Sequence, residues 1–350
     1  MDDCNPRALL RSSPCMPSPT ALLRRRGILR LLALGAVPAA LLDCSRSEGQ
    51  RAASGARWGR VKLSLNWVPE PEFGGFYAAR EGGAFQRAGM EVEILSGGGG
   101  VPVIQMVASG QADFGIVGAD EVLNGNARGV DVIPVFATFQ ISPLGIMVHA
   151  SRGAKGISDV LSSGTLAIEP GAPYAVFLKK KYGFDKARIV PYDGGVARFL
   201  LDKDFAQQCF VTSEPIAAKQ KGSDPQAFLV ADEGYTPYAT LVITRRALWN
   251  EKPDEVRAFV RAAREGWRAY LDDPGATNAL MAKLNPTMDV ETLAAVSAAQ
   301  KPLIETAETG RDHLGKMTSE RWEKLGKQLV ELGILKEAPP LSSYLVALDE

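Results

Sequence analysis

The chain has 350 residues, 46% of them hydrophobic, with 40 Lys and Arg against 40 Asp and Glu. This balance leaves no charge excess that would favour nucleic acid or an anionic surface as a partner. The length exceeds what one hydrophobic core usually serves, which predicts two lobes. Beyond residue 44 the one cysteine is Cys209, which excludes a disulfide framework there, and we expect no metal site and no cofactor.

The N-terminal residues have the pattern of an export signal. A basic stretch that contains Arg25 and Arg26 runs into an uncharged apolar run of 12 residues, Leu31–Leu42. A stable membrane span needs about 20 apolar residues, so this shorter run predicts a signal within residues 1–44. The stretch resembles a twin-arginine signal, with an ordinary Sec signal as the alternative. We therefore expect the protein in the periplasm or at the outer face of the cell membrane.

Cys44 stands where a lipoprotein signal places its acylated cysteine, which predicts a lipid anchor. Asp43 departs from that pattern because the slot normally holds a small residue. Cleavage after Ala39 is the competing outcome, and Met16 is an alternative start. The polar residues 45–59 then predict a disordered linker.

Strand and helix patterns alternate through the next part of the chain. The pattern predicts strands over 61–66, 90–95 and 113–117, alternating with helices over 76–85, 101–109 and 120–128. It repeats with strands over 165–168, 187–190 and 208–211 and helices over 174–182, 196–201 and 214–220. Between the repeats, residues 132–150 predict long strand segments broken by Pro134 and Pro143. A further strand is expected over 237–244, followed by helices near 253–271, 274–284, 290–300 and 319–332.

This repeat predicts an α/β protein with two lobes, each with a parallel-rich sheet flanked by helices, and a helical C-terminal part. We expect residues 60–140 and 241–350 to form lobe 1, and residues 141–240 to form lobe 2. Two crossing segments, Phe139–Gly145 and Thr236–Thr240, would act as hinges. A two-domain enzyme would produce a similar pattern.

One motif narrows the interpretation. The stretch Leu65-Asn66-Trp67-Val68-Pro69-Glu70-Pro71-Glu72-Phe73-Gly74-Gly75-Phe76-Tyr77-Ala78-Ala79 resembles the opening of the THI5/NMT1-like and sulfonate-binding group of transport proteins. Two shorter elements, Gly110–Gly115 and Thr212–Pro215, also resemble that family. The resemblance implies a type 2 periplasmic binding protein with a venus-flytrap fold, which acts as a monomer. It also implies an ABC permease and ATPase as partners, and no nucleic acid.

Ligand contacts in such a fold come from the loops that follow the strands. Glu214 is the main polar candidate, because the resemblance implies an acidic residue that faces the cleft in relatives that bind aminopyrimidines. A carboxylate accepts from an exocyclic amine and pairs with the adjacent ring nitrogen. The predicted ligand-binding residues are Asn66, Trp67, Glu70, Phe73, Ser96, Gly97, Gly118, Asp120, Gln140, Tyr174, Tyr192, Asp193, Thr212, Glu214 and Tyr238.

The motif departs from thiamine-precursor binders at Glu70 and Phe73, where the family typically carries Asn and His. We therefore expect a solute with N–H donors and an apolar face: a thiamine pyrimidine precursor, or riboflavin or its precursors. A sulfonate or nitrate fits less well because the carboxylates would repel it.

Enzyme classes are less favoured by the sequence. Related eukaryotic proteins make the pyrimidine from their own histidine beside a cysteine-rich stretch. This chain has only His149 and His313 and lacks that stretch, so we do not expect an enzyme. A glycosidase that uses two glutamates is an alternative, as is the effector domain of a transcription regulator.

Overall fold

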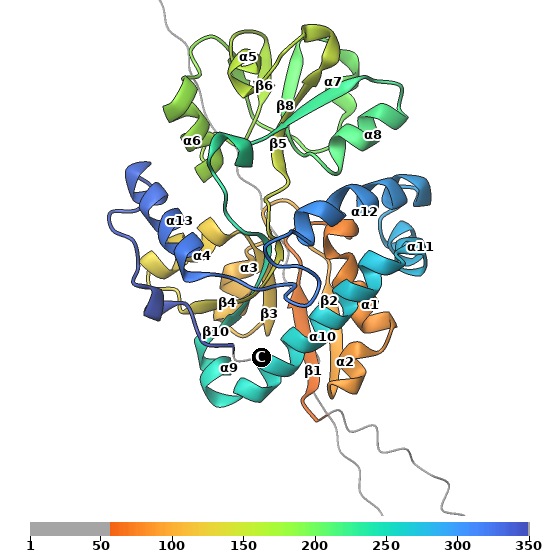
Figure 1. Cartoon of the computed structure of the whole chain (residues 1–350), viewed down its shortest axis with the longest axis vertical. Coiled ribbons are helices and arrows are strands. Elements are labelled where there is room, and N and C mark those ends of the chain that lie inside the picture. Colours follow the sequence, from red (N-terminus) through yellow and green to blue (C-terminus); the bar gives the residue numbers. More distant parts are fainter. Residues whose placement is uncertain (1–56, 349–350) are drawn as a thin grey trace, which may run out of the picture. The chain divides into compact units, whose positions relative to one another are not determined.

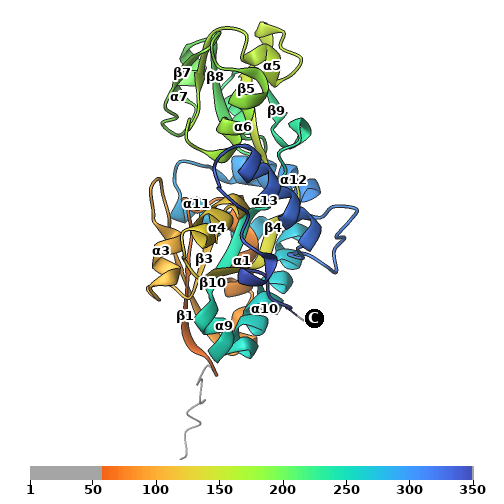
Figure 2. The ribbon, with the colours of Figure 1, turned by 90° about the vertical axis from the view of Figure 1, so that its left-hand side faces the viewer.

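Within residues 57–348, which the computed structural model describes, the strands form two five-stranded sheets (Figure 1). The first has the order β2-β1-β3-β10-β4, built from β1 (Gly59–Ser64), β2 (Met90–Leu95), β3 (Phe114–Val117), β4 (Val132–Phe139) and β10 (Ala239–Arg245). The second has the order β7-β6-β8-β5-β9, built from β5 (Leu144–His149), β6 (Thr165–Ala167), β7 (Arg188–Val190), β8 (Phe205–Phe210) and β9 (Pro225–Leu229). Figure 2 shows β7 and β9 at opposite edges of the second sheet.

Helices connect most of these strands. Those between strands of the first sheet are η1 (Pro71–Phe73), α1 (Gly74–Glu81), α2 (Ala84–Arg87), α3 (Val103–Ala108) and α4 (Ala119–Ala127). Those between strands of the second are η2 (Ala150–Arg152), α5 (Ile157–Val160), α6 (Pro173–Tyr182), α7 (Ala197–Leu201) and α8 (Glu214–Gln220). After β9 come η3 (Ala231–Glu233) and, beyond β10, α9 (Arg246–Glu251), α10 (Pro253–Asp272), α11 (Gly275–Leu284), α12 (Val290–Ile304), α13 (Ser319–Glu331) and η4 (Leu341–Ser343).

Both faces of each sheet are covered by hydrophobic cores. In β10, Leu241 and Ile243 pack with residues of α3, α4 and α13, whereas Val242 packs with residues of α1 and α10. In β5, Met147 and Val148 likewise belong to different cores. Successive side chains of a strand point to opposite faces, so this alternation places apolar helices on both sides. Figure 1 shows α3 and α4 on one side of the first sheet and α1, α2 and α10 on the other.

Helices α1 and α10 cross closely because glycines of α1 lie under aromatic rings of α10. A Cβ added to Gly74 would lie 2.2 Å from the Tyr270 ring, and one added to Gly75 would lie 2.1 Å from the Trp267 ring. One added to Gly266 would lie 2.3 Å from the carbonyl oxygen of Gly75. Since α1 follows η1 directly, this crossing anchors the loop between β1 and η1.

The chain passes between the sheets twice, and a side chain of α13 contacts both passages. One passage joins β4 to β5 and the other joins β9 to β10. The Arg321 guanidinium donates to the carbonyl of Gln140 in the first (2.7 Å) and to that of Thr236 in the second (3.3 Å). It also stacks 3.7 Å from the centre of the Tyr238 ring. Arg321 therefore ties together the two segments that the sequence predicted as hinges.

The sheets are mixed rather than wholly parallel. Strand β10 runs antiparallel to β3 and β4, and β5 runs antiparallel to β8 and β9. The expected break at Pro143 is confirmed, because residues 140–143 leave the first sheet and enter the second. The expected break at Pro134 is wrong, because β4 continues through that residue. Elements β9, α5 and α9 were not predicted; β9 is a half-buried strand at a sheet edge, so it lacks a clear alternation.

Several sequence-based expectations fall outside the described residues, namely the signal, Cys44 and most of the linker. The predicted lobe boundaries stay predictions, although the first sheet takes its strands from residues 59–139 and 239–245 and the second from residues 144–229. Across residues 57–348, no helix is both long and apolar enough to cross a bilayer.

Substitution of Gly75 tests the close crossing of α1 and α10. Gly75→Ala should lower the free energy of unfolding by about 2–3 kcal/mol, because the new methyl group must displace the Trp267 ring. Urea unfolding followed by circular dichroism measures the change. Gly171→Ala is the matched control, since a Cβ there meets nothing within 4 Å. Equal effects of the two substitutions would contradict the proposed packing.

Candidate functional site

Three glutamates, from loops that follow strands of the two sheets, lie close together. Glu70 and Glu72 flank the start of η1, which follows β1, and Glu214 begins α8, which follows β8. The Ser213 hydroxyl donates to Oε2 of Glu70 at 3.2 Å, so the two loops touch. The charges of Glu70 and Glu214 both act on Glu72. Loops that follow strands of the two sheets thus bring three glutamates together, as the strand-end rule predicts. We call this cluster the acidic cleft, because the two-lobed fold is expected to bind its ligand between the lobes.

Glu214 is held by partners from its own lobe. Its Oε2 accepts from the Phe210 backbone N–H at 2.8 Å, and its Oε1 accepts from the Tyr192 hydroxyl at 2.9 Å. Burial raises the pKa of Glu214, and these two hydrogen bonds oppose the rise. These two hydrogen bonds fix the carboxylate, and each carboxylate oxygen can accept one more hydrogen bond. The carboxylate is oriented before any ligand arrives.

Burial also dominates the electrostatics of the other two carboxylates. It raises the pKa of Glu70 to about 7, with a further rise from the charge of Glu214 and opposing hydrogen bonds from Ser213 and Trp67. Burial and then the charges of Glu70 and Glu214 hold the pKa of Glu72 well above its usual range. Among the ion pairs between described residues, none involves these three glutamates. The cleft therefore favours a ligand that brings positive charge or N–H donors.

Aromatic rings lie beside the carboxylates. The half-buried Trp67 ring sits between the two lobes: a Cβ on Gly99 would lie 3.7 Å from it, and one on Gly194 would lie 3.9 Å from it. The half-buried Tyr192 lies against Glu214 through its hydroxyl. Gly97 lets the two first-lobe loops meet, since a Cβ there would lie 2.3 Å from the carbonyl oxygen of Leu65. A flat ring could stack on either aromatic side chain while its edge reaches a carboxylate.

A second acidic group lies where α4 follows β3. Asp120 accepts from the Tyr235 hydroxyl at 2.9 Å, and burial raises the pKa of its carboxyl group. The Gly118 backbone N–H donates to Glu121 at 2.7 Å, which caps the helix. The charge of Glu169, which follows β6 of the other sheet, acts on Glu121. This second group thus also contains acidic residues from loops that follow strands of both sheets.

Three predicted contacts have structural partners instead. The Phe73 side chain is 0% exposed and belongs to the core that includes α1 and α10. The Gln140 amide donates to the carbonyl of Lys316 at 3.0 Å, and the Tyr238 hydroxyl accepts from the Thr318 N–H at 3.0 Å. In this conformation their side chains support the packing and the crossing segments, so we remove them from the candidate site.

The other predicted ligand-binding residues form an exposed group and a buried group, and their contact with a ligand stays a prediction. Asn66, Ser96 and Asp193 are exposed at loop surfaces. Tyr174 and Thr212 are buried, and the Tyr174 hydroxyl donates to Gln208.

Four residues that interact with the candidate site or the crossing segments were not predicted from the sequence: Glu121, Glu169, Gln208 and Arg321. The first two obey the same strand-end rule as Glu214 and could have been found, whereas Gln208 lies within β8 and Arg321 lies on α13, so no local signal marks either.

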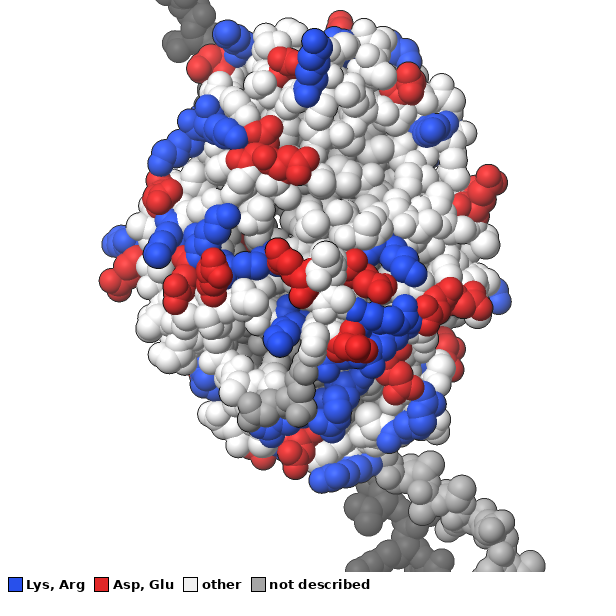
Figure 3. Space-filling model, in the orientation of Figure 1, with Lys and Arg blue, Asp and Glu red and all other residues white. Residues whose placement is uncertain are grey.

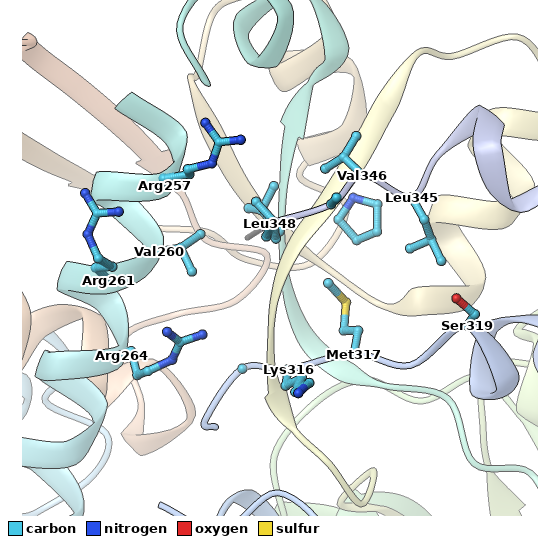
Figure 4. Close-up of a pocket in the computed structure, with 14 residues that line it drawn as sticks. Arg257, Val260, Arg261, Arg264, Lys316, Met317, Ser319, Leu345, Val346 and Leu348 are labelled. Atoms are coloured by element: carbon cyan, nitrogen blue, oxygen red, sulfur yellow. The ribbon is translucent and has the colours of Figure 1, made fainter. Parts of the chain in front are cut away.

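A cavity of about 630 Å³ lies elsewhere, between α10 and two C-terminal segments (Figure 4). Arg257, Arg261 and Lys316 are among its lining residues, and no acidic residue of the described chain lines it. Figure 3 shows Lys and Arg side chains gathered over the α10 region, with acidic side chains beside them. None of the predicted ligand residues lines this cavity. Its charge is opposite to that of the acidic cleft, so it is not the predicted site.

Comparisons with known proteins agree with the sheet architecture. The model of the family described as NMT1/THI5 like matches residues 70–277. The structure of the periplasmic aliphatic sulphonate binding protein SsuA from Escherichia coli aligns with a TM-score of 0.64 at 12% identity, over 82% of this chain and 92% of that one. At this identity the likeness shows the fold alone, and it confirms the predicted two-lobed periplasmic-binding fold.

Two relatives in sequence have different stated roles. The formylaminopyrimidine-binding protein of Halalkalibacterium halodurans is 24% identical over 274 residues, which cover 76% of this chain and 83% of that protein. The 4-amino-5-hydroxymethyl-2-methylpyrimidine phosphate synthase of Uromyces fabae is 22% identical over 252 residues, which cover 66% of this chain and 72% of that protein. Both names contain a substituted pyrimidine.

The raised pKa of Glu70 predicts a pH dependence of stability. The folded protein retains a proton on Glu70 that the unfolded chain releases near the ordinary pKa of 4.5, so this stabilisation is full below pH 4.5 and is lost as the pH rises through about 7. Glu70→Gln cannot ionise. The free energy of unfolding of this variant, measured relative to that of the wild type, should therefore be about 1–3 kcal/mol higher at pH 8 than at pH 4.5.

Urea unfolding at the two pH values measures this difference. Glu93→Gln is the control, because Glu93 is an exposed residue of β2. A pH-independent difference between Glu70→Gln and wild type would show that Glu70 is not buried beside Glu214.

Proposed function

Because the chain belongs to the NMT1/THI5-like family, we propose that it is an extracytoplasmic binding protein for a small heteroaromatic solute, such as a thiamine pyrimidine precursor. The observation that carries this proposal is an oriented, half-buried carboxylate, Glu214, hydrogen-bonded to Tyr192 in one lobe, with the Trp67 ring of the other lobe 3.9 Å from a Cβ built on Gly194. An aminopyrimidine matches this pairing, since its edge donates N–H groups and its faces are apolar.

The recognition would divide between the two lobes. Tyr192 and Glu214 from the second lobe are already hydrogen-bonded to each other and would meet the amine edge of the ligand. Trp67 and Glu70 from the first lobe would cover a face and accept a further donor. A ligand that engages both lobes draws them together, which is how hinged binding proteins enclose a solute. We infer that the solute is then released to an ABC permease and its ATPase, which would complete the proposed role in import.

Two alternative ligand classes would need different features in the acidic cleft. Riboflavin or its precursors would use the same acceptors but need room for a larger ring system. A sulfonate or nitrate would need a cation beside it, whereas the described cleft gathers Glu70, Glu72 and Glu214 with no Lys or Arg paired to them. The charges therefore favour the pyrimidine over an anion.

A pyrimidine synthase is disfavoured by the position of the histidines. His149 is 1% exposed, its Nε2 lies 2.7 Å from the Phe199 carbonyl oxygen, and its ring stacks on that of Phe199. His313 lies in the segment between α12 and α13. Neither belongs to the loops that form the cleft, so the chain offers no histidine there as a source of ring atoms.

Calorimetric titration of the purified protein with hydroxymethylpyrimidine, riboflavin and taurine tests the proposed ligand class. We expect binding of the pyrimidine with one site per chain and no release of product. Tight binding of taurine with no response to either ring would contradict the proposal, and turnover of the pyrimidine would favour an enzyme.

Glu214→Gln tests the role of the carboxylate in that binding. The substitution should weaken pyrimidine binding by about 1.5–3 kcal/mol, because it replaces a charge-assisted hydrogen bond by a neutral one. Asp224→Asn is the matched control, since Asp224 is an exposed acid between α8 and β9 that is not among the predicted ligand-binding residues. If both variants bind as wild type does, Glu214 serves only to hold the Phe210 backbone and the Tyr192 hydroxyl in place.

A further inference from the structure

The point where both passages leave the first sheet contains a strained residue. Thr240 has a φ of +47°, and among residues 57–348 it is the one residue other than glycine with a positive φ. It is 6% exposed and lies at the start of β10. A β-branched residue adopts this left-handed conformation only at an energetic cost, so the surrounding structure must impose it.

The partner strand has a second defect at the same position. Ala239 pairs with Phe139, and Leu241 pairs with Ala137, so Thr240 stands opposite Thr138 without a ladder pair of its own. The Thr138 hydroxyl is buried and finds no hydrogen-bond partner among the described residues. An unpaired buried hydroxyl is also unfavourable. Two neighbouring residues on adjacent strands therefore both destabilise this arrangement of the passages.

The two defects lie next to the ends of the crossing segments. Phe139 is the last residue of β4 and Ala239 is the first of β10, so any rotation of one lobe against the other must pass through these positions. Arg321 holds the segments just beyond them, which leaves Thr240 and its neighbours to absorb the backbone change.

The described conformation is one in which the lobes touch. Ser213 of the second lobe donates to Glu70 of the first at 3.2 Å, and Thr292 of α12 donates to Gln220 of α8. The strain at Thr240 is therefore present when the edges of the cleft are in contact. It would be released if the lobes separated and Thr240 returned to an extended φ.

We propose that Thr240 is the pivot of lobe movement and a positioning residue that acts on ligand affinity through the closed arrangement. Its strain opposes closure, so the free protein favours separated lobes until a ligand contributes binding energy. The apparent affinity is then reduced by the fraction of free protein that is closed. This inference rests on the proposed function for its consequence, but the closure equilibrium exists without any ligand.

Pulsed dipolar spectroscopy on the free protein tests the pivot. Nitroxide labels attached through E93C on β2 and K221C after α8, both exposed positions, report the separation of the lobes. The labels are introduced in a background in which the three cysteines before residue 57 are serine. Thr240→Gly should raise the ratio of closed to open molecules by roughly 5- to 10-fold, because glycine adopts positive φ without strain.

Two further variants make the test specific. Thr240→Val keeps the β-branched shape and the strain, so its distance distribution should match that of wild type. Asparagine tolerates the left-handed region, so Thr240→Asn should give a shift between those of the wild type and of Thr240→Gly. It replaces the glycine variant in the test if that variant folds poorly. Unchanged distances in both the Gly and Asn variants, or an equal shift in the Val variant, would overturn the proposal. Because no ligand is added, failure here is distinct from failure of the proposed ligand class.

Discussion

Three carboxylates from two separate sheets share one small space, and no cation of the described chain is paired with them. Their mutual repulsion and their burial both act against the contact between the lobes, and both raise the pKa of Glu70. A ligand with N–H donors or positive charge removes part of that cost when it binds. The contact between Glu70 and the loop that carries Glu214 is thus the interaction on which the site depends.

The scaffold holds these acidic loops in place from behind. Gly74 and Gly75 allow α10 to approach α1 and so fix the loop that carries Glu70 and Glu72. On the other lobe, the Phe210 N–H holds the Glu214 carboxylate at the end of β8. Rigid packing behind each loop orients the acceptors before binding, which lowers the entropic cost of recognition.

The crossing segments determine whether the loops meet at all. Arg321 contacts both of them from the C-terminal part of the chain, so the last helices of the first lobe take part in the link between the lobes. The strained backbone at Thr240 lies directly beside this contact. A binding protein must open again after it closes, and strain in the closed arrangement serves that need.

Much of this arrangement could be predicted from the sequence, because strand alternation and the strand-end rule are local signals. They located Glu70, Glu214, Trp67 and Tyr192 correctly at the ends of strands. The same rule misplaced Phe73, because a loop position does not reveal that a ring turns back into the core.

The antiparallel strands and Arg321 could not be predicted, since both depend on how distant segments meet. A strand that carries the chain from one sheet to the other, such as β10, has no local pattern that shows its direction. The contact of Arg321 with Gln140 joins residues 181 positions apart. Such contacts follow from the tertiary fold, not from residue periodicity.

A crystal structure of the protein soaked with hydroxymethylpyrimidine would test the central claim most directly. The account predicts electron density for the ring beside Trp67 and Tyr192, with its amine at hydrogen-bond distance, about 3 Å, from the Glu214 carboxylate. Density in the basic cavity beside Arg261, with the acidic cleft empty at a saturating concentration, would contradict it.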